Sequence, residues 1–521
     1  MDTMTLWIRQ DFSSSVKSVF SSPNITLWLT LLVYIAAMFL IGIIEGRKSK
    51  SVADFTVGGR NAGAWLSALS YGTAYFSAVM FVGYAGGTGL GYGLWGILAG
   101  IGNCIFGSWL AWKVLARRTR DIAARLKIKT MPEFFELRYG SKKMKTFAAI
   151  VIFVFLVPYS ASVYKGLGSV AEVLLGIDVN ICMIVIAVVA LILLVLGGYL
   201  VQARADFVQG IVMMFGIALL IIFVIRSRQV GGVSGLVEYA KSEWGFAPMS
   251  GDKWVSLIAT VLMTSFGTWG LPQMVQKYFG IKDDAQAKRG IKISTFFALL
   301  VAGGGYFIGS LCHRFFTVGV DMPAQDYIVP NMLKTVDMPT ILLGIVLVLL
   351  ISASVSTLCS VTLTACSTVS IDLIRERKKN MSDKQTATLT KTFCAVFVVL
   401  SYIVATTDTP ILDMMSYSWG IISGSFLDPY VLALFYKKLS RVAAWKGILT
   451  GFCIALIPAV AKFITMFGFE NAKLASLAAK GPTFACAAMI ASILVCIVIS
   501  ELDKKNTQDN SFFYTGTIEK E

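Results

Sequence analysis

The stretch VSLIATVLMTSFGTWGLPQMVQKYFG, residues 255–280, is long and apolar enough to cross a membrane, but Gly267, Gly270 and Pro272 interrupt it. A helix in lipid satisfies its backbone hydrogen bonds internally, so a break persists only where it lines a cavity or packs against protein. Residues 61–96, NAGAWLSALSYGTAYFSAVMFVGYAGGTGLGYGLWG, are interrupted in the same way by small and hydroxyl-bearing residues. The sequence therefore predicts membrane helices that are broken near their middle at two places.

Two interpretations of these breaks differ in what the glycines do. Glycines can simply permit close helix packing, as in pairs such as Gly83 and Gly87, and for either stretch alone we favour that interpretation. The two stretches, however, begin successive groups of five apolar segments, at approximately 57–228 and 253–440. Broken helices at corresponding positions are typical of an inverted-repeat transporter that binds its cargo at mid-membrane. The coincidence favours the transporter.

The composition is that of an integral membrane protein. Hydrophobic residues make up 56% of the chain and charged residues 15%, against roughly 25% charged in ordinary soluble domains. About thirteen apolar segments, each near the length that spans a bilayer, predict an all-α integral membrane fold whose second and seventh helices are broken. We assign residues 1–24 to an N-terminal tail, 25–501 to a transporter domain with additional spans at 25–44, 442–467 and 482–500, and 502–521 to a C-terminal tail.

Basic residues account for a net charge of +16 and are concentrated in every second predicted loop. These loops are GRKSK (46–50), ARRTRDIAARLKIK (116–129), KDDAQAKRG (282–290), RERKKN (375–380) and YKKLSR (436–441). Membrane proteins retain Lys and Arg on the cytoplasmic side, so the pattern predicts a multi-pass protein of the cell (plasma) membrane. Its N-terminal tail would be outside and its C-terminal tail cytoplasmic. The charge therefore indicates topology and not nucleic-acid binding.

No catalytic constellation is present in the sequence. His313 is the only histidine, which excludes a metal centre or catalytic triad built on histidines, and there is no HExxH, GxSxG or phosphate-binding loop. The nine cysteines are scattered singly through apolar segments, as buried thiols are. We therefore expect no enzyme. A membrane-bound sensor stays an alternative, but it would need a signalling domain after the last span.

The segment LISASVSTLCS, residues 350–360, is unusually rich in hydroxyls for a membrane helix. Ala353, Ser356, Thr357 and Ser360 fall within one arc of about 100° on an α-helix. Hard cations such as sodium prefer small oxygen donors, and the carbonyls freed at a helix break add more. Hydroxyls in membrane helices also bond to carbonyls four residues back and help helices pack. The residues alone leave these two roles equally open.

The same segment resembles the sodium-site helix of the sodium:solute symporters, a family that includes carriers of proline, pantothenate, sialic acid and glucose. Three further matches are VGGRNAGAWLSALSYGTAYFSA (57–78), GGYLVQARADFVQG (197–210) and WGLPQMVQKYFGIKDDAQAKRG (269–290). The resemblance extends over roughly residues 25–500 in the same order. It implies a LeuT-type fold, in which two groups of five helices form inverted repeats.

The resemblance also implies ion ligands, with Na+ as the coupling ion. A first sodium would be bound by the backbone carbonyls of Thr73, Phe76 and Ala353 and the hydroxyls of Ser356 and Thr357. A second sodium, carried by some family members, would lie at Asp206, Ser356, Cys359 and Ser360. Cys359 stands where a serine would be a better donor.

Two charged residues within the predicted spans have competing roles. Asp206 is a functional candidate because carboxylates are costly in a membrane, but it also precedes an apolar stretch that it could cap. Arg204 could pair with Asp206. Lys165 is more often a residue that snorkels or pairs than one that binds solute.

The resemblance implies a solute pocket without a fixed charge. Its lining would be Tyr75, Ser77, Tyr159, Thr264, Thr268 and Trp269. Tyr75 stands where the proline carriers have an aspartate, and Tyr159 stands where the sialic acid carriers have an arginine. Such a pocket suits a small organic solute, for example an amino acid such as proline, or a monocarboxylate or vitamin-like compound.

The function that the sequence favours is sodium-coupled import of such a solute by alternating access. The expected partners are the solute, the sodium ion and membrane lipid, and one copy of the chain is expected to suffice. The alternative is a sodium-independent exchanger or a channel on the same scaffold, which would need the broken helices but not Ser356 and Thr357.

Overall fold

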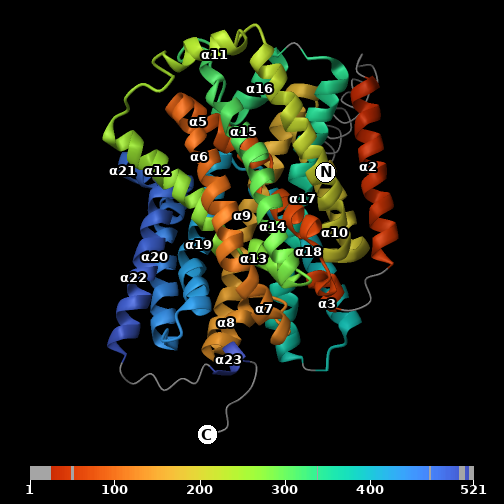
Figure 1. Cartoon of the computed structure of the whole chain (residues 1–521), viewed down its shortest axis with the longest axis vertical. Coiled ribbons are helices and arrows are strands. Elements are labelled where there is room, and N and C mark those ends of the chain that lie inside the picture. Colours follow the sequence, from red (N-terminus) through yellow and green to blue (C-terminus); the bar gives the residue numbers. More distant parts are fainter. Residues whose placement is uncertain are drawn as a thin grey trace.

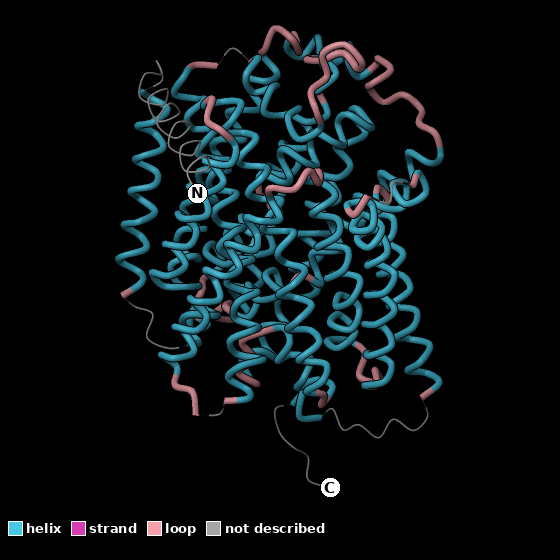
Figure 2. The backbone as a smooth tube through the Cα atoms, turned by 180° about the vertical axis from the view of Figure 1, so that it is seen from behind, coloured by secondary structure: helices cyan, strands magenta, loops and turns pink. Residues whose placement is uncertain are grey.

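A computed structural model describes residues 25–47, 52–336, 338–378, 380–468, 471–503 and 511–515. In this part of the chain every named element is a helix, and the only bridge of strand type is an isolated one between Ala62 and Ile281. The all-α prediction is confirmed (Figures 1 and 2). The predicted N-terminal tail 1–24 and most of the C-terminal tail lie outside the described residues.

The helices follow the predicted groups. Before and within the first group they are α2 Ile25–Gly46, α3 Val52–Val57, η1 Gly58–Arg60, α4 Ala64–Tyr75, η2 Val79–Tyr84, α5 Ala85–Tyr92, η3 Gly93–Gly96, α6 Ile97–Gly102, η4 Asn103–Leu110, η5 Trp112–Ala116, α7 Arg117–Arg125, α8 Met131–Tyr139, α9 Lys142–Leu175 and α10 Val179–Arg226. α10 bends at Gly198, whose φ is +57°, and is long enough for two spans, at 179–196 and 198–226.

The second group and the helices after it complete the chain. They are α11 Gly232–Ala240, α12 Gly251–Phe266, η6 Gly267–Gly270, α13 Pro272–Phe279, α14 Asp284–Ala298, η7 Leu299–Gly303, α15 Gly304–Ser310, η8 Cys312–Arg314, η9 Gln325–Tyr327, α16 Ile328–Thr335, α17 Thr340–Ser367, η10 Thr368–Arg375, α18 Asp383–Ala405, α19 Ile411–Phe435, α20 Arg441–Met466, α21 Ala472–Ala478, α22 Gly481–Leu502 and α23 Ser511–Thr515. α20 and α22 pack on α19 at the outside of the bundle (Figure 1).

Both predicted breaks are present. α4 ends at Tyr75, Phe76 is extended with φ −103° and ψ 101°, and helical structure resumes at Val79. In the second broken stretch Leu271 is extended and α13 begins at Pro272, with a bend of 47° between the two halves. Proline suits the first position of a helix because its missing N–H would have no partner there.

The expected number of spans, about thirteen by segment length, is not confirmed. Among the described residues ten helices are long and apolar enough to cross a membrane, or up to 11 if the bent pair counts as one span. Val79–Arg125 counts once in that number, although Gly93 turns the chain within it with φ 54° and ψ −133°. α19 has 25 residues but is not among the ten. The count of thirteen stays a prediction.

α17 lies in the interior of the bundle. Every residue from Ser352 to Ser367 is buried, and the helix packs against α2, α4, α9, α10 and α18. The window tested for membrane crossing is 78% buried in α17 but 22% buried in α2, which lies at the edge of the bundle. The hydroxyls of α17 therefore face other helices and not lipid.

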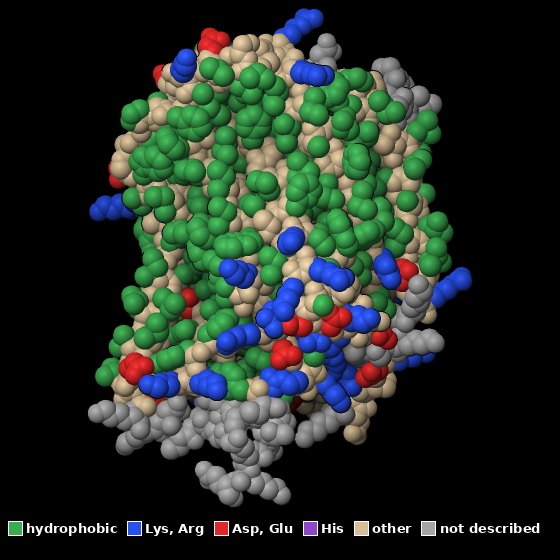
Figure 3. Space-filling view, viewed as in Figure 1, with side chains coloured by type: hydrophobic (Ala, Val, Ile, Leu, Met, Phe, Trp, Pro, Cys, Tyr) green, Lys and Arg blue, Asp and Glu red, His purple; other side chains and the backbone are tan. Residues whose placement is uncertain are grey.

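The predicted basic loops lie at one end of the molecule. Arg117 Nε lies 2.6 Å from a carboxylate oxygen of Asp284, and Lys142 Nζ lies 2.9 Å from Glu376, so loops from both groups meet there. The space-filling view shows Lys and Arg side chains gathered toward the lower end and hydrophobic side chains over most of the rest of the visible face (Figure 3). This arrangement fits the predicted cytoplasmic side, which stays a prediction.

Candidate ion and solute site

The hydroxyl of Thr357 joins the break in α4 to α17. Its Oγ1 lies 3.0 Å from the Thr73 carbonyl oxygen, 3.4 Å from that of Ala74 and 3.0 Å from that of Ala353. The last carbonyls of an α-helix have no partner within the helix, so the end of α4 at Tyr75 leaves oxygens free to face α17. Of the predicted first-sodium residues, the structure thus brings Thr73, Ala353 and Thr357 together. Phe76 follows directly, as the extended residue that ends α4.

Ser356, the remaining residue of that set, reaches the carboxylate of Asp206. Its Oγ donates to Asp206 Oδ1 at 2.6 Å, and Ser70 Oγ donates to Oδ2 at 2.5 Å. Asp206 lies inside α10 and its side chain is fully buried, so it does not cap a helix. Ser356 therefore connects the predicted first and second sodium sites.

Lys277 is the functional candidate that sequence reasoning missed. Its Nζ lies 3.2 Å from Asp206 Oδ2 and donates to Ser70 Oγ at 2.8 Å, and its side chain is only 2% exposed. The available signal was a charged side chain within a broken span, five residues after Pro272. Arg204, suggested as the partner of Asp206, lies instead 4.0 Å from Glu45.

Gln202 completes the surroundings of this lysine. With its amide oxygen facing the two groups that have protons to donate, it accepts from Lys277 Nζ at 3.1 Å and from Ser360 Oγ at 3.0 Å. Cys359 is directed elsewhere, with its Sγ 3.7 Å from the Ala190 carbonyl. Of the predicted second-sodium residues, Asp206 and Ser356 are in direct contact, and Ser360 is linked to the cluster through Gln202.

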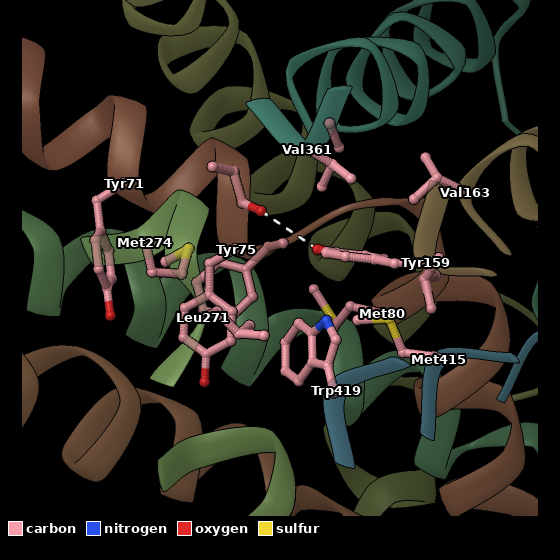
Figure 4. Close-up of a cluster of buried hydrophobic side chains, with 14 of the residues drawn as sticks. Tyr71, Tyr75, Met80, Tyr159, Val163, Leu271, Met274, Val361, Met415 and Trp419 are labelled. Atoms are coloured by element: carbon pink, nitrogen blue, oxygen red, sulfur yellow. Dashed lines mark hydrogen bonds between the residues drawn. The ribbon is translucent and has the colours of Figure 1, made fainter. Parts of the chain in front are cut away.

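Three of the predicted solute-pocket residues lie together at the break in α4. Tyr75 Oη donates to the Thr264 carbonyl at 2.5 Å, and Tyr159 Oη donates to the Ala74 carbonyl at 3.5 Å. Trp419 of α19, which sequence reasoning missed, lies between the two tyrosines, with ring centroids 6.0 Å from Tyr75 and 5.7 Å from Tyr159 (Figure 4). Its signal was an aromatic residue in the Ser- and Gly-rich stretch SYSWGIISGS, 416–425.

The other three predicted pocket residues make local contacts. Ser77 Oγ accepts from the Val79 N–H at 3.2 Å, and Thr268 Oγ1 donates to the Ser265 carbonyl at 2.8 Å. The indole of Trp269 donates to the Phe106 carbonyl at 3.0 Å. All six predicted pocket residues are buried.

Lys165 is separate from these clusters. Its Nζ donates to the carbonyls of Thr407 and Thr409, both at 3.0 Å, in the loop between α18 and α19. It lines a cavity of about 470 Å³ together with Asp326 and Asp408. Lys165 therefore pairs with loop carbonyls and not with the residues at the α4 break.

Comparisons with known proteins agree with this architecture. A family model described as the sodium:solute symporter family matches residues 55–451. The osmoregulated proline transporter OpuE of Bacillus subtilis (strain 168) is 27% identical over 448 residues, which cover 83% of this chain and 89% of that protein. The sodium/proline symporter of Escherichia coli (strain K12) is 25% identical over 437 residues, with coverages of 81% and 86%.

Solved structures show the fold. The substrate-bound outward-open structure of a Na+-coupled sialic acid symporter superposes with a TM-score of 0.72 at 17% identity, over 93% of this chain and 98% of that one. A closed structure of Mhp1, a nucleobase-cation-symport-1 family transporter, gives a TM-score of 0.53 at 13% identity, over 88% of this chain and 97% of that one. The predicted LeuT-type fold is confirmed.

Proposed function

We propose, from the premise that this chain belongs to the sodium:solute symporter family, that it imports a small organic solute, an amino acid such as proline first among the candidates, by alternating access. Sodium is the coupling ion of the family, and the chain is a transporter and not an enzyme. The proline transporters among its relatives support an amino acid. The absence of a charged side chain among the six predicted pocket residues favours a solute with little net charge.

The observation that carries this proposal is the contact between Thr357 and the carbonyls of Thr73 and Ala353. Thr73 belongs to the first repeat, and Thr357 and Ala353 belong to the second. A hydroxyl retains lone pairs when it donates its proton, so Thr357 can donate to one carbonyl and still face a cation. A sodium ion held by these oxygens, by the Phe76 carbonyl and by Ser356 would favour one arrangement of the two repeats. Solute binding to the same arrangement would then be coupled to sodium binding.

The solute residues support alternating access. Tyr75, Tyr159 and Trp419 pack at the α4 break, and each is at most 3% exposed. A solute that reaches these side chains needs the surrounding helices to move, first toward one side of the membrane and then toward the other. We place the basic loops on the cytoplasmic side of the plasma membrane and expect a single copy in lipid to be sufficient for transport.

The test is uptake by proteoliposomes that contain the purified protein. A panel of labelled amino acids, monocarboxylates and sugars is offered with an inward sodium gradient and with equal sodium on both sides. We expect one member, with proline the first choice, to accumulate only with the gradient. Uptake that ignores sodium would instead support the exchanger or channel.

A further inference from the structure

We propose that the ammonium group of Lys277 takes the place of a second sodium ion at Asp206, so that the chain binds one sodium ion and not two. The proposal deepens the proposed function, because it rests on the first sodium site. It differs from the prediction of a second sodium at Asp206, Cys359 and Ser360.

Every proton of the ammonium group has an acceptor. A lysine ammonium has three N–H donors, and Nζ of Lys277 lies 3.2 Å from Asp206 Oδ2, 2.8 Å from Ser70 Oγ and 3.1 Å from the Gln202 amide oxygen. The ring of Tyr199 lies on a further side, with its centroid 5.1 Å from Nζ. Oxygens around a compact positive charge are also what a bound sodium would need.

The charge of the cluster is balanced without a metal ion. Asp206 and Lys277 are 0% and 2% exposed, and a buried carboxylate needs a nearby positive charge to be stable. Lys277 already supplies that charge. A sodium ion placed on the same carboxylate would lie a few ångströms from the ammonium group, where the low dielectric of the interior makes like charges repel strongly.

The space and donors that remain are poor for a second ion. The cavity bordered by Asp206, Ser356 and Cys359 measures about 10 Å³, at the lower limit for a single water molecule. Cys359 offers sulfur where sodium prefers oxygen, and its thiol is directed to the Ala190 carbonyl. Ser360 already donates to Gln202.

The lysine also makes the connection between repeats that an ion would make. It lies on α13, directly after the break in the second broken span, and Ser70 lies on α4, before the break in the first. Asp206 bonds to Ser356, which is also a predicted ligand of the first sodium. The fixed cation therefore joins both broken helices to the first ion site but does not leave with the solute.

The test counts sodium ions bound to the purified full chain, using ²²Na⁺ in equilibrium dialysis without any solute. We expect the unaltered protein to saturate at one ²²Na⁺ per chain. Lys277→Met removes the charge and should raise the count to two, because Asp206 is then free to bind an ion. The double variant Lys277→Met with Asp206→Asn should return to one. Folding is checked for each variant by gel filtration.

Cys359→Ser is the matched control, because it supplies a better oxygen donor but leaves the lysine pair intact. It should still bind one ion, and a count of two would show that the thiol, and not the ammonium group, excludes the second sodium. Two ions on the unaltered protein would overturn the proposal even if Lys277→Met failed to fold. One ion on well-folded Lys277→Met would also overturn it. A count of zero on the unaltered protein would contradict the proposed function itself, and the proposal with it.

Discussion

Nζ of Lys277 lies 3.2 Å from Oδ2 of Asp206, and the two side chains are 2% and 0% exposed. The pair connects α13 of the second repeat to α10 of the first. Removal of one member of a buried ion pair leaves an uncompensated charge, whereas removal of both leaves none. This asymmetry separates a structural ion pair from two residues that act independently.

Asp206→Asn and Lys277→Met should each destabilise the protein by about 3–5 kcal/mol, the usual cost of an unpaired buried charge. The double variant should be more stable than either single variant, because it buries neither charge. Thermal unfolding in detergent at constant sodium concentration measures all three against the unaltered chain. Additive losses in the double variant would show that the two residues do not act as a pair.

Thr357→Ala should weaken sodium binding, because it removes an oxygen that meets the Thr73 and Ala353 carbonyls. The sodium concentration for half-maximal uptake should rise by about 5- to 150-fold, which corresponds to the usual coupling of about 1–3 kcal/mol. Ser354→Ala is the matched control, because that hydroxyl bonds only to the Leu350 carbonyl of its own helix, at 2.8 Å, among the contacts of the described residues. Unchanged sodium dependence in Thr357→Ala, with normal amounts of protein in the membrane, would leave the hydroxyls a packing role alone.

Tyr75→Phe should reduce solute affinity, because the hydroxyl ties the break in α4 to the Thr264 carbonyl on α12. The loss of one hydrogen bond predicts a rise of about 2- to 12-fold in the solute concentration for half-maximal uptake. The measurement uses the solute found in the proteoliposome panel, at saturating sodium. Tyr71→Phe, which removes a hydroxyl bonded to the Gly107 carbonyl one turn earlier, serves as the control. Equal effects of the two variants would argue against a special role for Tyr75.

The predicted topology can be tested with reporters fused within loops. A reporter after Arg120 should behave as cytoplasmic and one after Gly231 as external, because basic loops remain inside. Arg120 donates to the Lys282 carbonyl, so both basic loops must lie on the same side. A cytoplasmic reporter at Gly231 would contradict the arrangement of spans.

The sequence by itself determined the features that depend on short stretches of chain. Hydrophobic segments of membrane length indicated the all-α membrane class, and Gly267, Gly270 and Pro272 located a break that the structure places at Leu271. These features are local, because the backbone of each segment must satisfy its own hydrogen bonds in lipid. Motifs of a few residues were likewise enough to indicate the family and the hydroxyl face of α17.

Only the tertiary structure decided which side chains meet. Thr357 and Thr73 are 284 residues apart, and Lys277 and Asp206 are 71 apart, so no local pattern relates them. The direction in which a helical side chain points depends on how its helix is rotated against its neighbours, and packing sets that rotation. This is why Lys277 could be counted from the sequence as one more basic residue, while its role as the partner of Asp206 became visible only when α4, α10, α13 and α17 were placed together.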